Sequence, residues 1–210
     1  MKSVQTKVII YGAGRGGHLV AEMLSFDATK QVIGMVDDNS ALWGKRVAGI
    51  EVIGGKARLL DLWHERYLDA VVISLATPST MGLREELYVG LKKNGVVFTN
   101  AIHPAAVISP SAQIGENNVI SPGTIIGTLT RLGDNNRISG LCNLEHHSTI
   151  GSHNFFGAHC VTGGAVTIGD RCVFGMGSVI DSLLSIGDGV RVGNGVVVRK
   201  NLPNSNCGGS

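Results

Sequence analysis

The sequence lacks the features that commit a chain to disulfides, membranes or nucleic acid. Its four cysteines form no CxxC pair, and three of them lie in a repeated segment, so disulfides are not expected. The early apolar stretch is far too short for a signal sequence or a membrane span and leads directly into a glycine-rich loop. The formal net charge is only +2, with no run of basic residues, which disfavours nucleic acid and membrane surfaces as partners. We therefore expect a cytoplasmic protein.

Aromatic residues are also scarce, at 5% of 210 residues, whereas glycine occurs 30 times. Apolar residues still make up 43% of the chain, so the glycines fit a fold with many tight corners better than a disordered segment. The length allows one or two domains with a real core.

A repeat of six residues dominates the second half of the chain. Bulky side chains recur sixteen times without a break in phase, and only Thr162 among them is not fully apolar. Such a period is neither helical nor a simple strand alternation, and it is typical of a parallel β-helix built from hexapeptides. Ten of the sixteen are followed at once by glycine, which we expect at corners where a Cβ would crowd. The series is Ile108, Ile114, Ile120, Ile126, Leu132, Ile138, Leu144, Ile150, Phe156, Thr162, Ile168, Phe174, Ile180, Ile186, Val192 and Val198.

The first hundred residues show a different pattern, in which strand-like and helix-like segments alternate. This alternation predicts a small parallel sheet with helices on its faces. We place the boundary between two domains, 1–102 and 103–210, where the hexapeptide period begins. The expected strands are 7–11, 31–36, 70–75 and 96–99, and the expected helices are 17–24, 56–66 and 79–93.

A glycine loop, Gly12–Gly17, fits the pattern G-x-G-x-x-G between the first strand and the first helix. Backbone N–H groups at a helix N-terminus donate hydrogen bonds to a phosphate. A carboxylate about twenty residues later, here Asp37 or Asp38, binds a ribose hydroxyl. About a hundred residues cannot hold the full six-stranded dinucleotide fold, which favours a nucleotide or nucleotide-sugar over NAD. Alternatively, the glycines only allow the strand and the helix to pack closely.

Four of the seven histidines, His146, His147, His153 and His159, fall within fourteen residues. The last three share one position of the hexapeptide, and residues six apart lie on successive faces of a three-sided coil. They therefore do not converge within one subunit, and no metal site is predicted. Glu145 and His146 instead break the glycine position of their repeat, which favours a histidine base at a functional site. A corner that simply faces water is the alternative.

Several stretches together carry a resemblance to a known family: VIIYGAGRGGH, GMVDDNSALWGKRVAGIEVIG, IHPAAVISPSAQIG, LEHHSTIG and CVTGGAVTIG. Along nearly its whole length the chain resembles the hexapeptide acyltransferases of the sialic-acid O-acetyltransferase and UDP-amino-sugar N-acetyltransferase type. The resemblance implies an α/β half-Rossmann domain that binds a nucleotide-sugar, followed by a left-handed parallel β-helix. It further implies a homotrimer that uses acetyl-CoA as co-substrate.

The resemblance also implies roles for individual residues. It makes His146 the catalytic base, with Glu145 and His147 beside it. The family usually has an acidic residue at the position of His147 and a histidine at the position of Phe155. Substrate contacts map onto Gly14, Arg15, Gly16, Asp37 and Asp38, and coenzyme contacts onto Phe155, Met176 and Gly193. Apart from the resemblance, we expect a backbone N–H at a glycine corner to bind the thioester oxyanion, with Gly163 and Gly164 as candidates.

Three functions remain open from the sequence. The first is direct acetyl transfer from acetyl-CoA to an amine or hydroxyl of a nucleotide-linked sugar, with His146 taking the proton. The second is a non-catalytic nucleotide-sensing or scaffold protein, for which His147 and Phe155 would mark a decayed site. The third is a nicotinamide-dependent enzyme based on the glycine loop alone. Binding of acetyl-CoA distinguishes the first function from the second.

Overall fold

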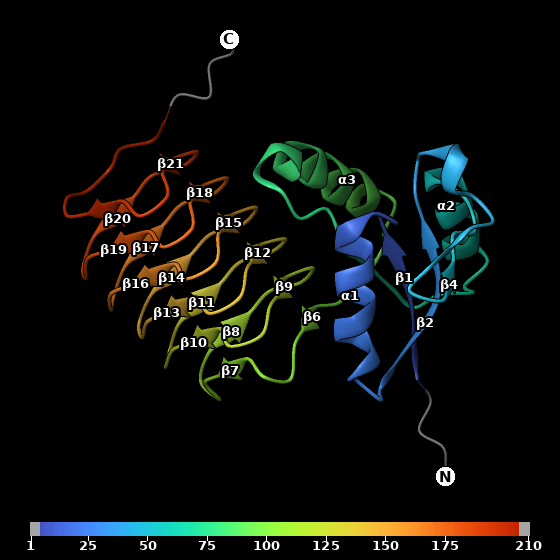
Figure 1. Ribbon diagram of the computed structural model, residues 1–210, viewed down its shortest axis with the longest axis horizontal. Helices are drawn as coiled ribbons and strands as arrows, with labels where there is room; N and C mark the ends of the chain where they lie inside the picture. Colours follow the sequence, from blue (N-terminus) through green and yellow to red (C-terminus); the bar gives the residue numbers. More distant parts are fainter. Residues whose placement is uncertain (1–4, 206–210) are drawn as a thin grey trace.

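The structure, a computed structural model, describes residues 5–205, and Cys207 lies outside this range. An α/β region is followed by a parallel β-solenoid (Figure 1). The α/β region has a three-stranded parallel sheet in the order β2-β1-β5, with α1 on one face and α2 and α3 on the other. None of the described helices could cross a membrane. The elements are β1 (Thr6–Tyr11), α1 (Arg15–Ser25), β2 (Lys30–Val36), β3 (Arg46–Val47), β4 (Ile50–Glu51), α2 (Lys56–His64), β5 (Ala70–Ile73), α3 (Met81–Lys93) and the 3-10 turns η1 (Ser40–Leu42) and η2 (Pro78–Thr80).

The sequence-based expectations for this region hold except at two places. The expected strand 96–99 is only a bridge between Val71 and Phe98. The antiparallel hairpin of β3 and β4 was not predicted, because strands of two residues are too short to show alternation.

The solenoid has three parallel sheets, which we call sheets I, II and III, and each strand pairs with the strand eighteen residues away. Sheet I is β7 (Val107–Ile108), β10 (Ile125–Ile126), β13 (Asn143–Leu144), β16 (Val161–Thr162), β19 (Val179–Ile180) and β22 (Val197–Val198). Sheet II is β8 (Gln113–Ile114), β11 (Arg131–Leu132), β14 (Thr149–Ile150), β17 (Thr167–Ile168) and β20 (Ser185–Ile186). Sheet III is β6 (Ala101–Ile102), β9 (Val119–Ile120), β12 (Arg137–Ile138), β15 (Phe155–Phe156), β18 (Val173–Phe174) and β21 (Arg191–Val192).

The predicted hexapeptide side chains fill the core of the solenoid, where Phe156 and Phe174 stack with ring centroids 4.8 Å apart. The expected crowding at the corner glycines is also found, and its source is the next coil. A Cβ on Gly127 would lie 2.6 Å from the backbone nitrogen of His146, and one on Gly157 would lie 2.7 Å from that of Met176. The predicted fold class, an α/β region followed by a left-handed β-helix, is confirmed.

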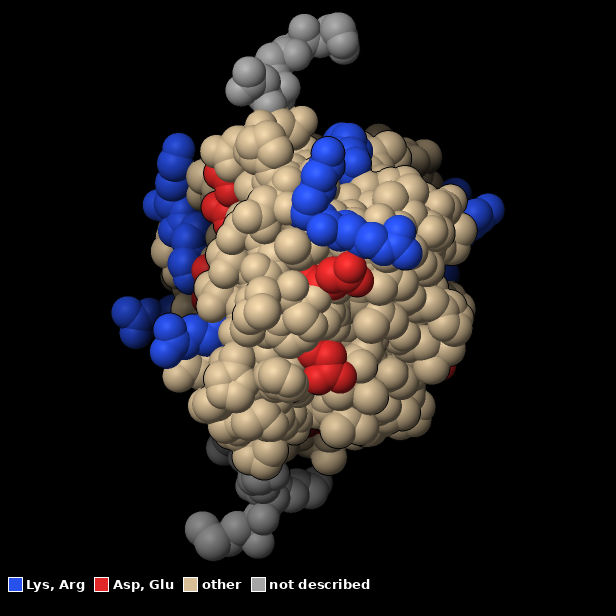
Figure 2. Space-filling view, turned by 90° about the vertical axis from the view of Figure 1, so that its left-hand side faces the viewer, with Lys and Arg blue, Asp and Glu red and all other residues tan. Residues whose placement is uncertain are grey.

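The three outer faces of the solenoid differ in chemistry. The outward residues of sheet II are polar and exposed, whereas those of sheet III are buried from Ala101 to Phe155, on the side where the α/β region packs. The outward residues of sheet I carry no charge, and the corners beside them expose Leu129, Leu141 and Leu183. Figure 2 views the molecule from the side where the last coils of the solenoid, with β19 and β20, lie in Figure 1, and most of the surface there is uncharged. Sheet I is thus the apolar face of the solenoid.

The α/β region is joined to the solenoid by Arg84 of α3, whose side chain is fully buried. Its Nη2 donates to the carbonyl of Asn117 (2.6 Å) and its Nε to that of Asn135 (3.3 Å), both on solenoid corners. Its Nη1 donates to the carbonyls of Ile73 and Leu75, at the end of β5. Burial, with a smaller contribution from Arg137, lowers the pKa of Arg84 to about 9, so the guanidinium stays charged at neutral pH. Arg84 therefore fixes the end of β5 against the solenoid.

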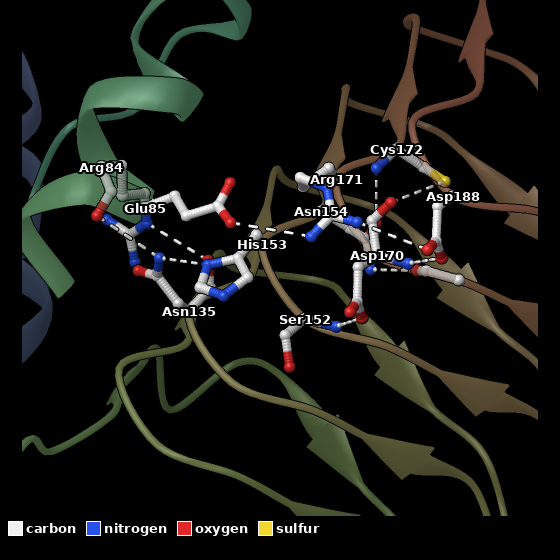
Figure 3. Close-up of polar contacts among 11 residues, drawn as sticks. Arg84, Glu85, Asn135, Ser152, His153, Asn154, Asp170, Arg171, Cys172 and Asp188 are labelled. Atoms are coloured by element: carbon white, nitrogen blue, oxygen red, sulfur yellow. Dashed lines mark hydrogen bonds and ion pairs between the residues drawn. The ribbon is translucent and has the colours of Figure 1, made fainter. Parts of the chain in front are cut away.

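We expect Arg84→Met to lower the free energy of unfolding by about 3 kcal/mol or more, because each buried carbonyl that loses its donor costs about 1–3 kcal/mol. Arg171→Met is the matched control. Arg171 lies nearby in Figure 3 and forms exposed ion pairs with Glu85 (3.7 Å) and Asp188 (3.3 Å), which are worth at most about 1 kcal/mol. Urea denaturation measures both variants, and equal losses of stability would contradict the role given to Arg84.

Candidate active site

A cavity of about 600 Å³ opens at the carboxyl ends of the parallel strands, which is where open α/β sheets bind ligands. Tyr11 ends β1, and Ser74 follows β5. The structure brings all five predicted substrate residues into the wall of this cavity: Gly14, Arg15, Gly16, Asp37 and Asp38. The solenoid contributes Arg137, a residue that the sequence analysis did not single out.

The glycines of the loop have two different roles. A Cβ on Gly16 would collide with the carbonyl of Ser74, and one on Gly17 with that of Gly12, so these two allow close packing. Nothing lies within 4 Å of a Cβ built on Gly14, which is the N-cap of α1 and has no side-chain capping bond. Close packing thus explains Gly16 and Gly17, while Gly14 leaves the positive end of α1 open to an anion.

The two aspartates hold the wall of the cavity in shape. Asp37 accepts the backbone N–H of Ala13 in the glycine loop (2.8 Å). Asp38 accepts the hydroxyl of Tyr11 (2.6 Å) and the first N–H of α2, that of Lys56 (3.0 Å). Burial and the hydrogen bond to Asp38 raise the pKa of Tyr11, so its hydroxyl remains protonated and donates. Each carboxylate oxygen has a second lone pair for a ligand hydroxyl.

Glu145, His146 and His147 form a corner between sheets I and II. The equivalent N–H groups of Gly127 and Gly163 donate to carbonyls of the next coil, at 2.8 and 2.7 Å, but that of Glu145 donates to the hydroxyl of Thr162 (3.1 Å). Glu145, one of six residues that stand where glycine is commonest, therefore contacts Thr162, the one core residue of the series that is not fully apolar. Sequence reasoning missed this link, although a separation of seventeen residues, nearly one coil, could have revealed it.

The exposed ring of His146 lies against Gly164. A Cβ on Gly164 would be 2.5 Å from Cε1 and 2.8 Å from Nε2 of His146. The Nδ1 atoms of His146 and His147 are 3.0 Å apart, so one ring donates and the other accepts. The carboxylate of Glu145 is turned back toward Asn143, whose amide donates to it (2.9 Å). His146 thus has a fixed imidazole neighbour on one side and a glycine backbone on the other.

Not all predicted site residues lie together in one chain. None of the residues 145–147 lines the cavity. Phe155 lies on sheet III, paired in register with Arg137 and 8% exposed. Met176, 59% exposed, and Gly193 lie one coil apart on the corner between sheets III and I. Sheet I therefore separates these two residues from His146 and Gly164.

The other clustered histidines are apart from this corner. His153 lies between sheets II and III, with its Nδ1 2.8 Å from the amide nitrogen of Asn135, and burial lowers its pKa (Figure 3). His159 lies between sheets III and I. Among residues 5–205, no group of three or more histidine, cysteine, aspartate or glutamate side chains is placed to hold a metal ion.

Three family models match the chain. The PglD N-terminal domain matches residues 7–80, the bacterial transferase hexapeptide (six repeats) residues 147–182, and the hexapeptide repeat of succinyl-transferase residues 184–200. No curated protein matches.

Solved structures match over almost the whole chain. PerB from Caulobacter crescentus, in complex with CoA and GDP-perosamine, is 30% identical, with 95% of this chain and 91% of that chain covered and a TM-score of 0.85. A mutant of GDP-perosamine N-acetyltransferase from the same organism, with the same two ligands, is 29% identical at the same coverage, with a TM-score of 0.86. The acetyltransferase domain of PglB from Neisseria gonorrhoeae, with acetyl coenzyme A, shares the fold at 23% identity, with 95% and 93% covered and a TM-score of 0.83.

Proposed function

This chain belongs to the hexapeptide-repeat sugar acyltransferases and is an acyltransferase, and we propose that it moves an acetyl group from acetyl-CoA to an amino or hydroxyl group of a nucleotide-linked sugar. The cavity in which all five expected substrate residues meet is the observation that carries this proposal. PerB, whose complex contains CoA and GDP-perosamine, supports the pairing of these two substrates.

The nucleotide would lie along the glycine loop. Its phosphates face Gly14, Arg15 and Gly16 at the positive end of α1, and its ribose faces Asp37 or Asp38. The sugar then extends into the remaining part of the cavity. The aspartates would serve both as ligands and as supports for the loop, since each already holds backbone N–H groups.

The acyl transfer needs one base. Nε2 of His146 would take the proton of the acceptor as its nitrogen or oxygen bonds to the thioester carbonyl carbon. The C–S bond then breaks, and the protonated His146 gives the proton to the leaving thiolate, so the coenzyme departs as a thiol and His146 is neutral again. If Nδ1–H of His146 donates to Nδ1 of His147, Nε2 carries the lone pair that the reaction requires. His147 would thus fix the tautomer, although an imidazole cannot supply the negative charge of the acidic residue that the family usually has at this position.

The remaining groups would bind the coenzyme and the developing charge. Of the two glycines expected at the oxyanion, Gly163 already donates its N–H to the carbonyl of Ile180 (2.7 Å), which leaves Gly164, directly beside His146. The exposed thioether of Met176 is an apolar surface suited to the pantetheine arm, together with Phe155 and Gly193.

We further propose a cytoplasmic homotrimer with a nucleotide-sugar domain, 1–102, and an acyltransferase domain, 103–210. An uncharged, apolar sheet I is the kind of surface that repeated copies of one chain bury against each other. Because His146 and the cavity lie on different edges of the solenoid, each site would combine the cavity of one protomer with His146 of its neighbour.

The first experiment measures thiol release from acetyl-CoA with UDP-, GDP- and dTDP-linked amino sugars. We expect acceptor-dependent release, reduced about 10²–10⁴-fold in His146→Ala, because that variant lacks the base. His64→Ala, at the exposed end of α2, is the control and should match the wild type. Near-normal turnover in His146→Ala would exclude the assigned base, and failure of acetyl-CoA to bind would favour a scaffold.

A second variant tests the contact beneath the ring. In Gly164→Ala the new methyl group would meet the His146 imidazole, and since that ring is exposed it would swing away without disturbing the coil. We expect a large fall in kcat with unchanged thermal stability. Gly82→Ala, where a Cβ meets nothing within 4 Å, should leave kcat as it is, and a fully active Gly164→Ala would contradict the placement of His146.

Mixed trimers test the shared site. Gly14→Glu puts a negative charge where the phosphate would bind without a steric conflict, so it should be inactive, as should His146→Ala. When the two variants are co-expressed with different tags and purified by both tags in turn, every cyclic trimer obtained contains both variants, and about one third of the sites combine an intact cavity with an intact His146. Activity that stays absent in the mixed assembly would place both halves of the site in one protomer.

A further inference from the structure

Arg137 is the one solenoid residue among those that line the cavity in the described part of the chain. It begins β12 on sheet III and is only 6% exposed. A buried arginine normally has all its donors satisfied and an acidic partner. Arg137 meets neither condition.

The guanidinium of Arg137 is bonded on one side only. Its Nη1 donates to the hydroxyl of Ser121 (2.8 Å) and the carbonyl of Ile138 (2.7 Å). Its Nε is buried and has no hydrogen-bond partner among residues 5–205. No ion pair within that range includes Arg137 either. One face of the guanidinium is thus anchored to the solenoid, while Nε still lacks an acceptor.

A second buried cation lies close by. Arg84 lowers its own cost of burial by donating to four backbone carbonyls, and the two positive charges repel each other. Burial lowers the pKa of Arg137 to about 10, so it also stays charged at neutral pH. Arg84 and Arg137 are thus two buried cations that form no ion pair among residues 5–205, and Arg137 is the one of them that lines the cavity, where an anion would neutralise its charge.

We propose that Arg137 is a substrate-binding residue that donates from the solenoid to an anionic oxygen of the nucleotide-linked sugar. The inference rests on the proposed function and adds to it a contact opposite the glycine loop. The expected anion is the diphosphate, because arginine pairs readily with phosphate and every nucleotide-sugar of the proposed class carries one. A carboxylate on the sugar would present the same chemistry. Held between α1 and Arg137, the substrate would be oriented by both parts of the chain.

The test compares Arg137→Met and Arg137→Lys with the wild-type trimer by calorimetric titration of UDP, GDP and dTDP and by KM for the accepted nucleotide-sugar. Loss of a charge-assisted hydrogen bond should weaken binding about 10- to 100-fold in Arg137→Met. Arg137→Lys keeps the charge without the fork of donors, so its loss should be smaller. Arg131→Met, at the same strand position on the exposed sheet II, should match the wild type, and acetyl-CoA binding should be unchanged throughout.

The outcomes separate the possible anions. Equal losses for the free nucleotide and the nucleotide-sugar assign Arg137 to the diphosphate. A loss confined to a nucleotide-sugar with a carboxylate assigns it to the sugar. Wild-type affinities in folded Arg137→Met overturn the inference and leave the proposed function intact, provided that the wild type still shows acceptor-dependent thiol release. A wild type that binds no nucleotide overturns both. If Arg137→Met does not fold, Arg137→Lys decides by the same measurements.

Discussion

The stacking of one coil on the next, eighteen residues later, is the constraint on which the rest of the structure depends. Backbone hydrogen bonds join each coil to its successor, and at one corner asparagine side chains repeat the link: Asn118 accepts the N–H of Asn136 (2.9 Å), and Asn136 that of Asn154 (2.8 Å). Successive coils lie so close together that a Cβ on many of the glycines that follow core residues would collide with the backbone of the next coil. The position of an outward residue within the eighteen-residue coil therefore determines on which face or corner of the solenoid it lies.

A regular scaffold makes its exceptions informative. Glu145 occupies a corner position where glycine is commonest, and Thr162 occupies a core position that is otherwise aliphatic. The two are joined across the coils, because the hydroxyl of Thr162 accepts the N–H of Glu145. The repeat can thus present Glu145, His146 and His147 at one corner without losing the hydrogen bond between coils. This coupling argues that the corner is a site supported by its neighbours rather than a surface exposed to water.

The sequence predicts those parts of the structure that depend on local spacing. The hexapeptide period fixes the core residues, and the glycine loop with Asp37 and Asp38 fixes one wall of the cavity, since both follow from positions along the chain. The roles of Arg84 and Arg137 could not be predicted in this way. In a linear sequence an arginine on a helix or before an aliphatic residue looks like a surface charge, and both become buried only when α3 and the loop after β5 pack on sheet III. Residues 96–99 form only a bridge between Phe98 and Val71 of β5, which the short apolar run of residues 96–99 does not reveal by itself.

The two buried arginines show how the same side chain can serve the fold and the ligand. Arg84 has its donors directed at carbonyls from both sides of the boundary, so its charge is dispersed and its place is structural. Arg137 is also buried, but its Nε has no acceptor among residues 5–205, and within that range it is the one solenoid residue that lines the cavity. A fold that only needed a rigid boundary would gain by replacing Arg137 with an apolar residue of similar size. A ligand that binds in the cavity therefore explains a buried arginine at this position better than packing at the boundary does.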